Sequence, residues 1–76
     1  MNEGRVVGFD AELGYGWISR GEGMPDLFCH FTAIDGSGYR RLAKGDWVSY
    51  DVEVGPKGKP QAANVRVIEQ PEARRA

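Results

Sequence analysis

Hydrophobic and polar positions alternate along several short stretches of this chain. The longest regular stretch is 47–54 (WVSYDVEV), which places Val48, Tyr50, Val52 and Val54 on one side and the intervening residues on the other. Successive side chains of a β-strand point to opposite faces, so a period of two is typical of a strand. The pattern therefore predicts a half-buried strand over these eight positions.

Four other stretches predict strands, and glycine- or proline-rich turns separate several of them. Gly8 interrupts the first strand, where glycine often marks a bulge, so alternation does not assign a face to Phe9. Residues 1–4 are expected to fray, and a short 3₁₀ turn is expected at 32–34 with Thr32 as its cap. The predicted strands are 5–10, 14–20, 26–31 and 61–69, the last with Ala63, Val65 and Val67 alternating.

Two of these strands carry rings at every second position. Tyr15 and Trp17 share one face of 14–20, and Phe28 and His30 share one face of 26–31. The aliphatic residues and the cysteine of the same strands have the opposite parity, which suits a core: Ile18, Leu27 and Cys29. The strands are therefore expected to bury an aliphatic side and to expose a surplus of rings.

Five short strands in a chain of 76 residues would leave unpaired edges unless the sheet closes into a barrel. The predicted fold is all-β, a five-stranded antiparallel barrel of the oligonucleotide/oligosaccharide-binding (OB) type. The face of strands 2 and 3 is the usual binding surface of that barrel, and these two strands carry the rings. One domain is expected over 1–70, followed by a disordered tail at 71–76.

Composition narrows the candidate functions. Ten basic and eleven acidic residues give a net charge of −1, whereas a protein that binds nucleic acid through phosphates alone is usually basic. One cysteine and one histidine cannot complete a four-ligand zinc site or a disulfide, and Cys29 is expected to be an inert core thiol. No nucleophile–base pair or paired carboxylates stand out, so neither an enzyme nor a cofactor is expected. No signal peptide or long apolar run is present, which predicts a cytoplasmic protein without a membrane partner.

The two ring-bearing stretches resemble the two ribonucleoprotein motifs of bacterial cold-shock proteins. Residues 14–18 (GYGWI) are similar to Gly-Phe-Gly-Phe-Ile, and residues 27–31 (LFCHF) are similar to Val-Phe-Val-His-Phe. The likeness covers about residues 4–68 in order. The sequence departs from the family pattern at Val7-Gly8, where Lys-Trp is usual, and at Leu13, where lysine is usual. Trp17 is a larger ring than the usual phenylalanine.

The resemblance implies an OB barrel that binds single-stranded RNA and DNA, often as an RNA chaperone or a transcription antiterminator. Its binding platform, carried over to this sequence, consists of Phe9, Tyr15, Trp17, Phe28, His30, Phe31 and Tyr39. Alternation would turn Phe31 inward, and the family's use of this ring requires the strand to end at His30. Lys57 and Lys59 in the 55–60 loop are candidate phosphate contacts, or else belong to a plain solvated loop.

Two further alternatives remain open from the sequence. The barrel could be a protein-interaction module with reduced nucleic-acid binding, because a usual tryptophan and two usual lysines are missing. The expected partner is nonetheless single-stranded RNA or DNA. A monomer is expected, and the long 32–46 segment would also allow a strand-exchanged dimer. Trp47 faces outward by alternation, either over a neighbouring strand or in a dimer contact.

Overall fold

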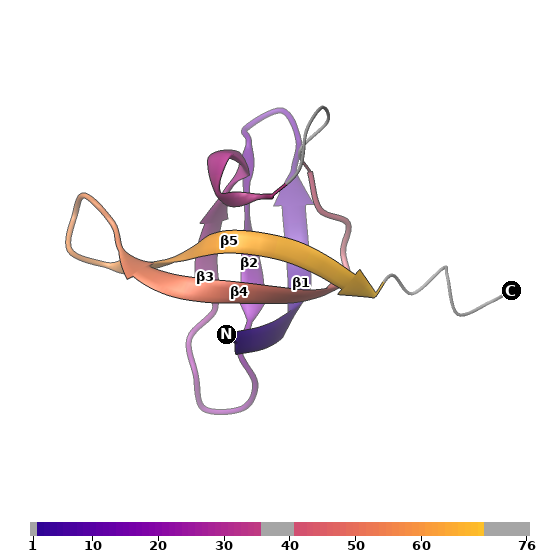
Figure 1. Cartoon of the computed structure of the whole chain (residues 1–76), viewed down its shortest axis with the longest axis horizontal. Coiled ribbons are helices and arrows are strands. Elements are labelled where there is room, and N and C mark those ends of the chain that lie inside the picture. Colours follow the sequence, from indigo (N-terminus) through magenta and orange to yellow (C-terminus); the bar gives the residue numbers. More distant parts are fainter. Residues whose placement is uncertain (1, 36–40, 70–76) are drawn as a thin grey trace, which may run out of the picture.

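The computed structural model describes residues 2–35 and 41–69. In this part of the chain the strands close into a barrel in the order β1-β2-β3-β5-β4 (Figure 1), which confirms the predicted all-β, five-stranded barrel. The predicted domain boundary at residue 70 and the tail at 71–76 lie outside the described residues. The elements are β1 (Asn2–Asp10), β2 (Tyr15–Ser19), β3 (Leu27–His30), the 3₁₀ turn η1 (Phe31–Ala33), β4 (Trp47–Val54) and β5 (Pro60–Glu69).

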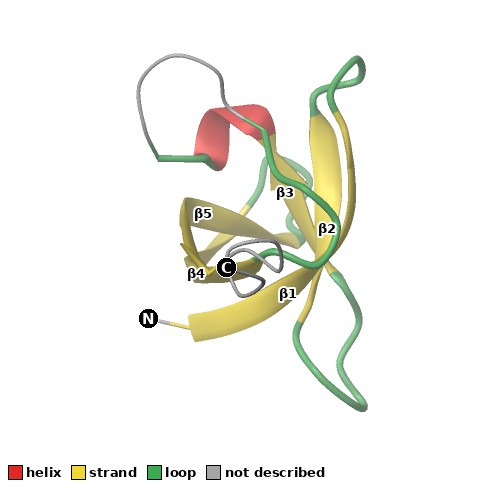
Figure 2. Cartoon of the chain, turned by 90° about the vertical axis from the view of Figure 1, so that its right-hand side faces the viewer, coloured by secondary structure: helices red, strands yellow, loops and turns green. Residues whose placement is uncertain are grey.

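The barrel closes through a contact between its third and fifth strands. β3 runs parallel to β5, with Phe28 opposite Gln61, whereas the other described pairings are antiparallel. An isolated parallel bridge between Ile34 and Val65 continues this contact beyond η1. Figure 2 shows η1 directly after β3 at one end of the barrel. Closure leaves β2 and β3 side by side, as the ring-bearing face requires.

β1 begins three residues earlier than predicted. Residues 2–4 were expected to fray, but Asn2 pairs with Tyr50 and Gly4 with Val48 on β4. A Cβ added to Gly4 would lie 2.5 Å from the carbonyl oxygen of Ser19, so the strands approach closely there. The prediction was wrong because β4, which supplies the pairing partners, is distant in the sequence.

The core lies inside the barrel and combines residues from every strand. Its centre is fully buried, and each such aliphatic side chain contributes about 1.5–3 kcal/mol relative to exposure. Phe9, Ala33 and Val67 are partly buried against it. The buried hydrophobic residues are Val6, Ile18, Leu27, Cys29, Ile34, Leu42, Val48, Tyr50, Ala62 and Val65.

The end of the β4–β5 hairpin departs from the predicted half-buried pattern. Val48 and Tyr50 are buried as expected, but Val52 is 46% exposed and Val54 is 73% exposed. Figure 1 shows this end of the hairpin projecting past the barrel, so no core lies beneath these valines. Alternation predicted the strand correctly, but whether one face of a strand is buried depends on what packs against that face.

The predicted alternation of β5 fails at a bulge. Ala62 and Val65 are buried, whereas Ala63 is only partly buried. The register with β4 shifts opposite this segment, and Asn64 adopts a positive φ of 51°, which asparagine tolerates better than most residues. The Asn64 side-chain amide also donates to a carboxylate oxygen of Asp51 at 3.0 Å. The extra residue inverts the parity of the strand on either side of it.

Candidate nucleic-acid interface

The rings of β2 and β3 lie opposite one another across the ladder. Trp17 pairs with Phe28, and Tyr15 pairs with His30. The centroid of the Phe28 ring lies 5.5 Å from that of Trp17 and 5.4 Å from that of Tyr15. These separations fall in the range of aromatic pairs that contact each other. Alternation therefore predicted the shared face correctly, and pairing brings the four rings into one cluster.

Glycine on the inner side explains why the rings of β2 must face outward. Gly16 is buried and pairs with Cys29 on β3 and with Phe9 on β1. A Cβ on Gly16 would lie 2.3 Å from the carbonyl oxygen of Gly8 and 2.7 Å from the Phe9 ring, so a larger residue has no room. Inverting the strand would force Tyr15 or Trp17 into that space.

Phe9 lies at a different place from the other rings. A register shift between Val6 and Gly8 makes the break predicted at Gly8 a bulge, and it puts Phe9 opposite Gly16. Phe9 is partly buried and packs against the core. Its ring therefore borders the inner side of the barrel, whereas the rings of Trp17 and Phe28 lie on the outer face.

Phe31 extends the ring cluster beyond β3. The strand ends at His30, as the prediction for Phe31 required, and η1 begins with Phe31 itself. The Phe31 ring centroid lies 4.7 Å from that of His30, and the side chain is 40% exposed. Gly14, at a φ of 81°, accepts a hydrogen bond from the Phe31 backbone N–H at 2.8 Å and leaves room for the ring.

His30, and not Thr32 as predicted, caps η1. The His30 Nδ1 accepts a hydrogen bond from the Thr32 backbone N–H at 3.4 Å and lies 2.9 Å from the Thr32 hydroxyl oxygen. An accepting Nδ1 places the ring proton on Nε2 in the neutral imidazole. Local hydrogen bonding therefore orients the imidazole beside Phe28 and Phe31, at ring-centroid distances of 6.4 and 4.7 Å.

A groove of about 610 Å³ opens beside the Trp17–Phe28 pair. The 55–60 turn forms its other wall, so Lys57 and Lys59 line the same groove as these two rings. Gln61 also lines it because β5 pairs with β3 at Phe28. Sequence reasoning missed Gln61, since only the parallel closure of the barrel reveals its neighbour. The other lining residues include Arg20, Pro25, Asp26, Pro56 and Pro60.

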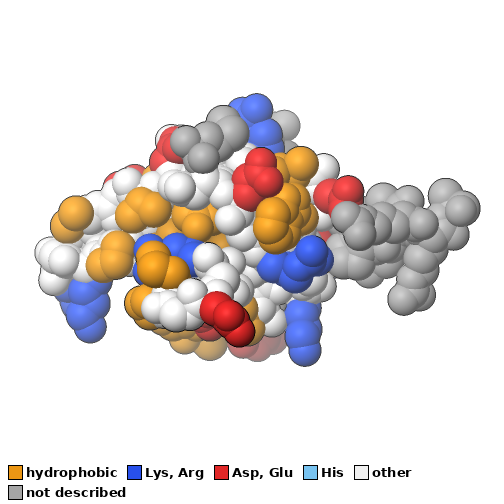
Figure 3. Space-filling view, turned by 90° about the horizontal axis from the view of Figure 1, so that it is seen from below, with side chains coloured by type: hydrophobic (Ala, Val, Ile, Leu, Met, Phe, Trp, Pro, Cys, Tyr) orange, Lys and Arg blue, Asp and Glu red, His pale blue; other side chains and the backbone are white. Residues whose placement is uncertain are grey.

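Charged groups around the rings are few and mixed in sign. Lysine and arginine side chains share the lining of the groove with one aspartate. The face of the molecule seen from below in Figure 3 likewise mixes basic and acidic side chains with hydrophobic ones. Arg20 donates from Nε to the Pro25 carbonyl oxygen at 3.0 Å, which holds the arginine at the groove wall. Asp10 has a structural role, since one carboxylate oxygen accepts from the backbone N–H groups of Glu12 and Leu13. Tyr39, a predicted platform residue, lies outside the described residues.

The remaining chemistry of the described residues is sparse. Cys29 is fully buried, as predicted, and burial raises the pKa of its thiol to about 11, which disfavours the reactive thiolate. Among residues 2–35 and 41–69, no three His, Cys, Asp or Glu side chains are grouped to hold a metal ion. No helix in the described part of the chain is long and apolar enough to cross a membrane.

Comparisons with known proteins identify the family. The model of the 'Cold-shock' DNA-binding domain matches residues 2–68. Cold shock protein CspB of Bacillus caldolyticus is 49% identical over 65 residues, which cover 86% of this chain and 96% of that protein. Cold shock protein CspD of Bacillus subtilis is 48% identical over the same coverage of this chain and 96% of its own length. The Drosophila Unr CSD456 structure shares the fold, with a TM-score of 0.70 at 24% identity over 92% of this chain and 27% of that one.

This chain belongs to the cold-shock domain family, and its barrel is an OB fold. The resemblance noted in the two ring-bearing motifs is thereby confirmed. The family model is described as a DNA-binding domain, which agrees with the nucleic-acid-binding class expected from the sequence.

Proposed function

We propose that this cold-shock domain protein binds single-stranded RNA and DNA with low sequence specificity by stacking unpaired bases on its exposed rings. The observation that carries the proposal is the continuous row of rings from Trp17 through Phe28 and His30 to Phe31. Tyr15 lies beside this row against Phe28. Every base has a π-face, so such a surface accepts successive bases whatever their identity.

The expected stacking free energies are large enough for the rings to supply most of the affinity. Each base–aromatic stack contributes about 1–3 kcal/mol by truncation, so four or five stacks exceed the cost of ordering a short strand. The result is a dissociation constant of about micromolar or below. Lys57, Lys59 and Arg20 at the groove add phosphate contacts without dominating, consistent with the net charge of −1.

The preference for single strands supplies a mechanism for RNA chaperoning and for regulation of transcription or translation. Bases inside a duplex are stacked on one another and do not reach the rings. Binding therefore lowers the free energy of opened strands relative to hairpins by the differential affinity of the protein for the two states. No nucleotide hydrolysis is needed. The residues proposed to act are Tyr15, Trp17, Phe28, His30, Phe31, Tyr39, Lys57 and Lys59, with Gln61 and Arg20 at the groove wall. Phe9, which is only partly buried against the core, is proposed to contact the strand through the part of its ring that stays exposed.

Titration of a labelled heptathymidine, followed by fluorescence anisotropy, tests this proposal. The protein should bind the single strand and not a duplex of the same length. The double variant Tyr15→Ala/Phe28→Ala should raise the dissociation constant about thirtyfold or more, because it removes two stacking rings. Tyr15→Leu/Phe28→Leu keeps apolar volume without rings and should show the same loss.

The matched control removes apolar side chains away from both rings and groove. Val52→Ala/Ile68→Ala truncates two residues that are 46% and 50% exposed, and it should leave affinity within about twofold. Thermal unfolding followed by circular dichroism verifies that each variant is folded. Absence of binding by the wild-type protein at about 100 μM oligonucleotide would overturn the proposal and favour a protein-interaction module.

A further inference from the structure

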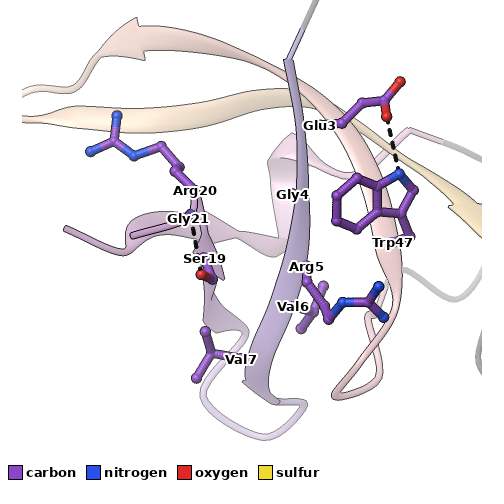
Figure 4. Close-up of a pocket in the computed structure, with 9 residues that line it drawn as sticks. All are labelled: Glu3, Gly4, Arg5, Val6, Val7, Ser19, Arg20, Gly21 and Trp47. Carbon is purple, nitrogen blue, oxygen red and sulfur yellow. Dashed lines mark hydrogen bonds between the residues drawn. The ribbon is translucent and has the colours of Figure 1, made fainter. Parts of the chain in front are cut away.

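A second groove, of about 380 Å³, crosses β1 between β2 and β4. Figure 4 shows Arg5 and Trp47 on one side of β1, and Ser19 and Arg20 on the other. Glu3 and Val7 complete the outward-facing wall, and Gly4 lies between the two sides. None of these residues except Arg20 lines the groove beside Trp17 and Phe28.

The centre of the second groove is an arginine held against an indole. The guanidinium carbon of Arg5 lies 5.1 Å from the centroid of the Trp47 ring, which is a cation–π distance. Arg5 also donates from Nη1 to the Gly45 carbonyl oxygen at 2.9 Å, and Trp47 donates from Nε1 to a Glu3 carboxylate oxygen at 3.1 Å. Trp47 therefore lies over the neighbouring strand β1, which was one of the two alternatives open from the sequence.

This arrangement resembles the chemistry that recognises an unpaired base. Bases stack on aromatic rings and on the planes of arginine guanidinium groups. Arg5 is exposed, and its hydrogen bond and ring contact hold the guanidinium in place before any ligand arrives. Little side-chain entropy would be lost when a base covers it.

The two grooves have one lining residue in common. Arg20 lines both of them. Ser19 follows Trp17 by two positions on the outer face of β2, a rise of about 7 Å, and Arg5 pairs with Ser19 on β1. A strand leaving the Trp17 ring thus meets Arg20 and then the Arg5–Trp47 pair.

We propose that a single strand too long for the ring platform continues over Arg20 into the second groove, where one base stacks on Arg5 against Trp47. This inference rests on the proposed function, because it extends the same strand. Two arginines against one glutamate favour an anionic ligand, and the carboxylate of Glu3 is engaged by the indole. The guanidinium plane beside the Trp47 ring favours a strand with bases to stack over an acidic peptide. The platform and the second groove then form one binding path.

The test compares variants on oligothymidines of seven and fifteen residues. Arg5→Gln should weaken binding of the 15-mer about five- to tenfold and leave the 7-mer within twofold, because only the longer strand reaches Arg5. Arg5→Lys keeps the positive charge but lacks the planar guanidinium group. It should therefore weaken binding of the 15-mer less than Arg5→Gln does, but still measurably. Arg66→Gln is the matched control, since it removes one arginine charge at an ion pair with Asp35 outside both grooves.

The decisive quantity is the dissociation constant of the variant divided by that of the wild type, compared at each oligonucleotide length. A 15-mer binds more tightly than a 7-mer for a statistical reason alone, because it offers several overlapping seven-residue sites. In a Trp17→Phe background Trp47 is the remaining tryptophan, and its indole emission should change with the 15-mer but not with the 7-mer. If Arg5→Gln weakened binding equally at both lengths, or if Trp47 emission did not change with the 15-mer, this inference would be overturned. Failure of the wild-type protein to bind either length would instead overturn the proposed function.

Discussion

Gly8 lies directly opposite Trp17 in the ladder between β1 and β2, and a Cβ added to Gly8 would lie more than 4 Å from any atom beyond its chain neighbours. The cold-shock pattern usually carries tryptophan at the position of Gly8 and phenylalanine at that of Trp17. In this chain the tryptophan therefore lies on β2, whereas the family pattern places it opposite, on β1. Because the position beside Trp17 carries no side chain, a ring introduced at residue 8 would enlarge the stacking surface.

Gly8→Trp should strengthen binding of heptathymidine about fivefold or more. The new indole would stand beside Trp17 on the outer face and supply a further stacking surface worth about 1–3 kcal/mol. Anisotropy of a labelled oligonucleotide is the measurement, because added tryptophan fluorescence would confuse a quenching assay. Gly8→Ala is the control and should leave affinity unchanged. Equal affinity of Gly8→Trp and wild type would contradict this prediction.

Gly16→Ala should destabilise the fold, whereas Gly8→Ala should not. A methyl group on Gly16 would lie 2.3 Å from the Gly8 carbonyl oxygen and 2.8 Å from the Phe9 Cα, both backbone atoms that cannot move aside cheaply. Overpacking of this kind costs about 1–3 kcal/mol. Urea denaturation followed by circular dichroism measures the difference between the variants. A Gly16→Ala protein as stable as wild type would mean that β1 and β2 separate more easily than their packing indicates.

Salt should weaken binding of the short strand only modestly. Two or three phosphate contacts from Lys57, Lys59 and Arg20 give a slope of log K against log salt of about −1.4 to −2.1, or about tenfold between 50 and 200 mM. Lys57→Gln/Lys59→Gln should reduce the magnitude of the slope by about 1.4. Titration at four salt concentrations measures it. A thousandfold loss in the wild-type protein would show that cations, and not rings, supply the affinity.

Stability should fall at alkaline pH in a way that depends on Cys29. Burial raises the pKa of its thiol from 9.0 to about 11, so the folded state favours the neutral form. This contribution is fully present below pH 9 and is lost as pH rises toward 11. Cys29→Val keeps an apolar side chain without a titrating group, and its unfolding free energy should decline less over that range. Parallel decline of both proteins in denaturant titrations at pH 8, 9, 10 and 11 would refute the assignment to Cys29.

The sequence predicted the ring-bearing face well because β2 and β3 are short and regular. Alternation alone oriented Tyr15, Trp17, Phe28 and His30, and no bulge falls between them. The same rule failed on β5, where the bulge at Asn64 inverts the parity and buries Ala62. Local pattern is reliable only while the register is unbroken.

Long-range pairing explains what sequence reasoning missed. Gln61 was not recognised as a groove residue because its neighbour Phe28 lies on a strand remote in the sequence. The early start of β1 and the place of Trp47 over Glu3 likewise depend on the pairing of β1 with β4. Such contacts are set by barrel closure, which no window of neighbouring residues reveals.

The parallel contact of β3 with β5 also imposes an order in time. Both ring motifs lie in the first half of the chain, but one wall of their groove consists of residues 55–61. During synthesis from the N-terminus, the rings leave the ribosome well before the strand that closes the barrel. A nascent chain therefore carries both motifs before it has a groove, and competence to hold a strand arrives only with the last turn and strand.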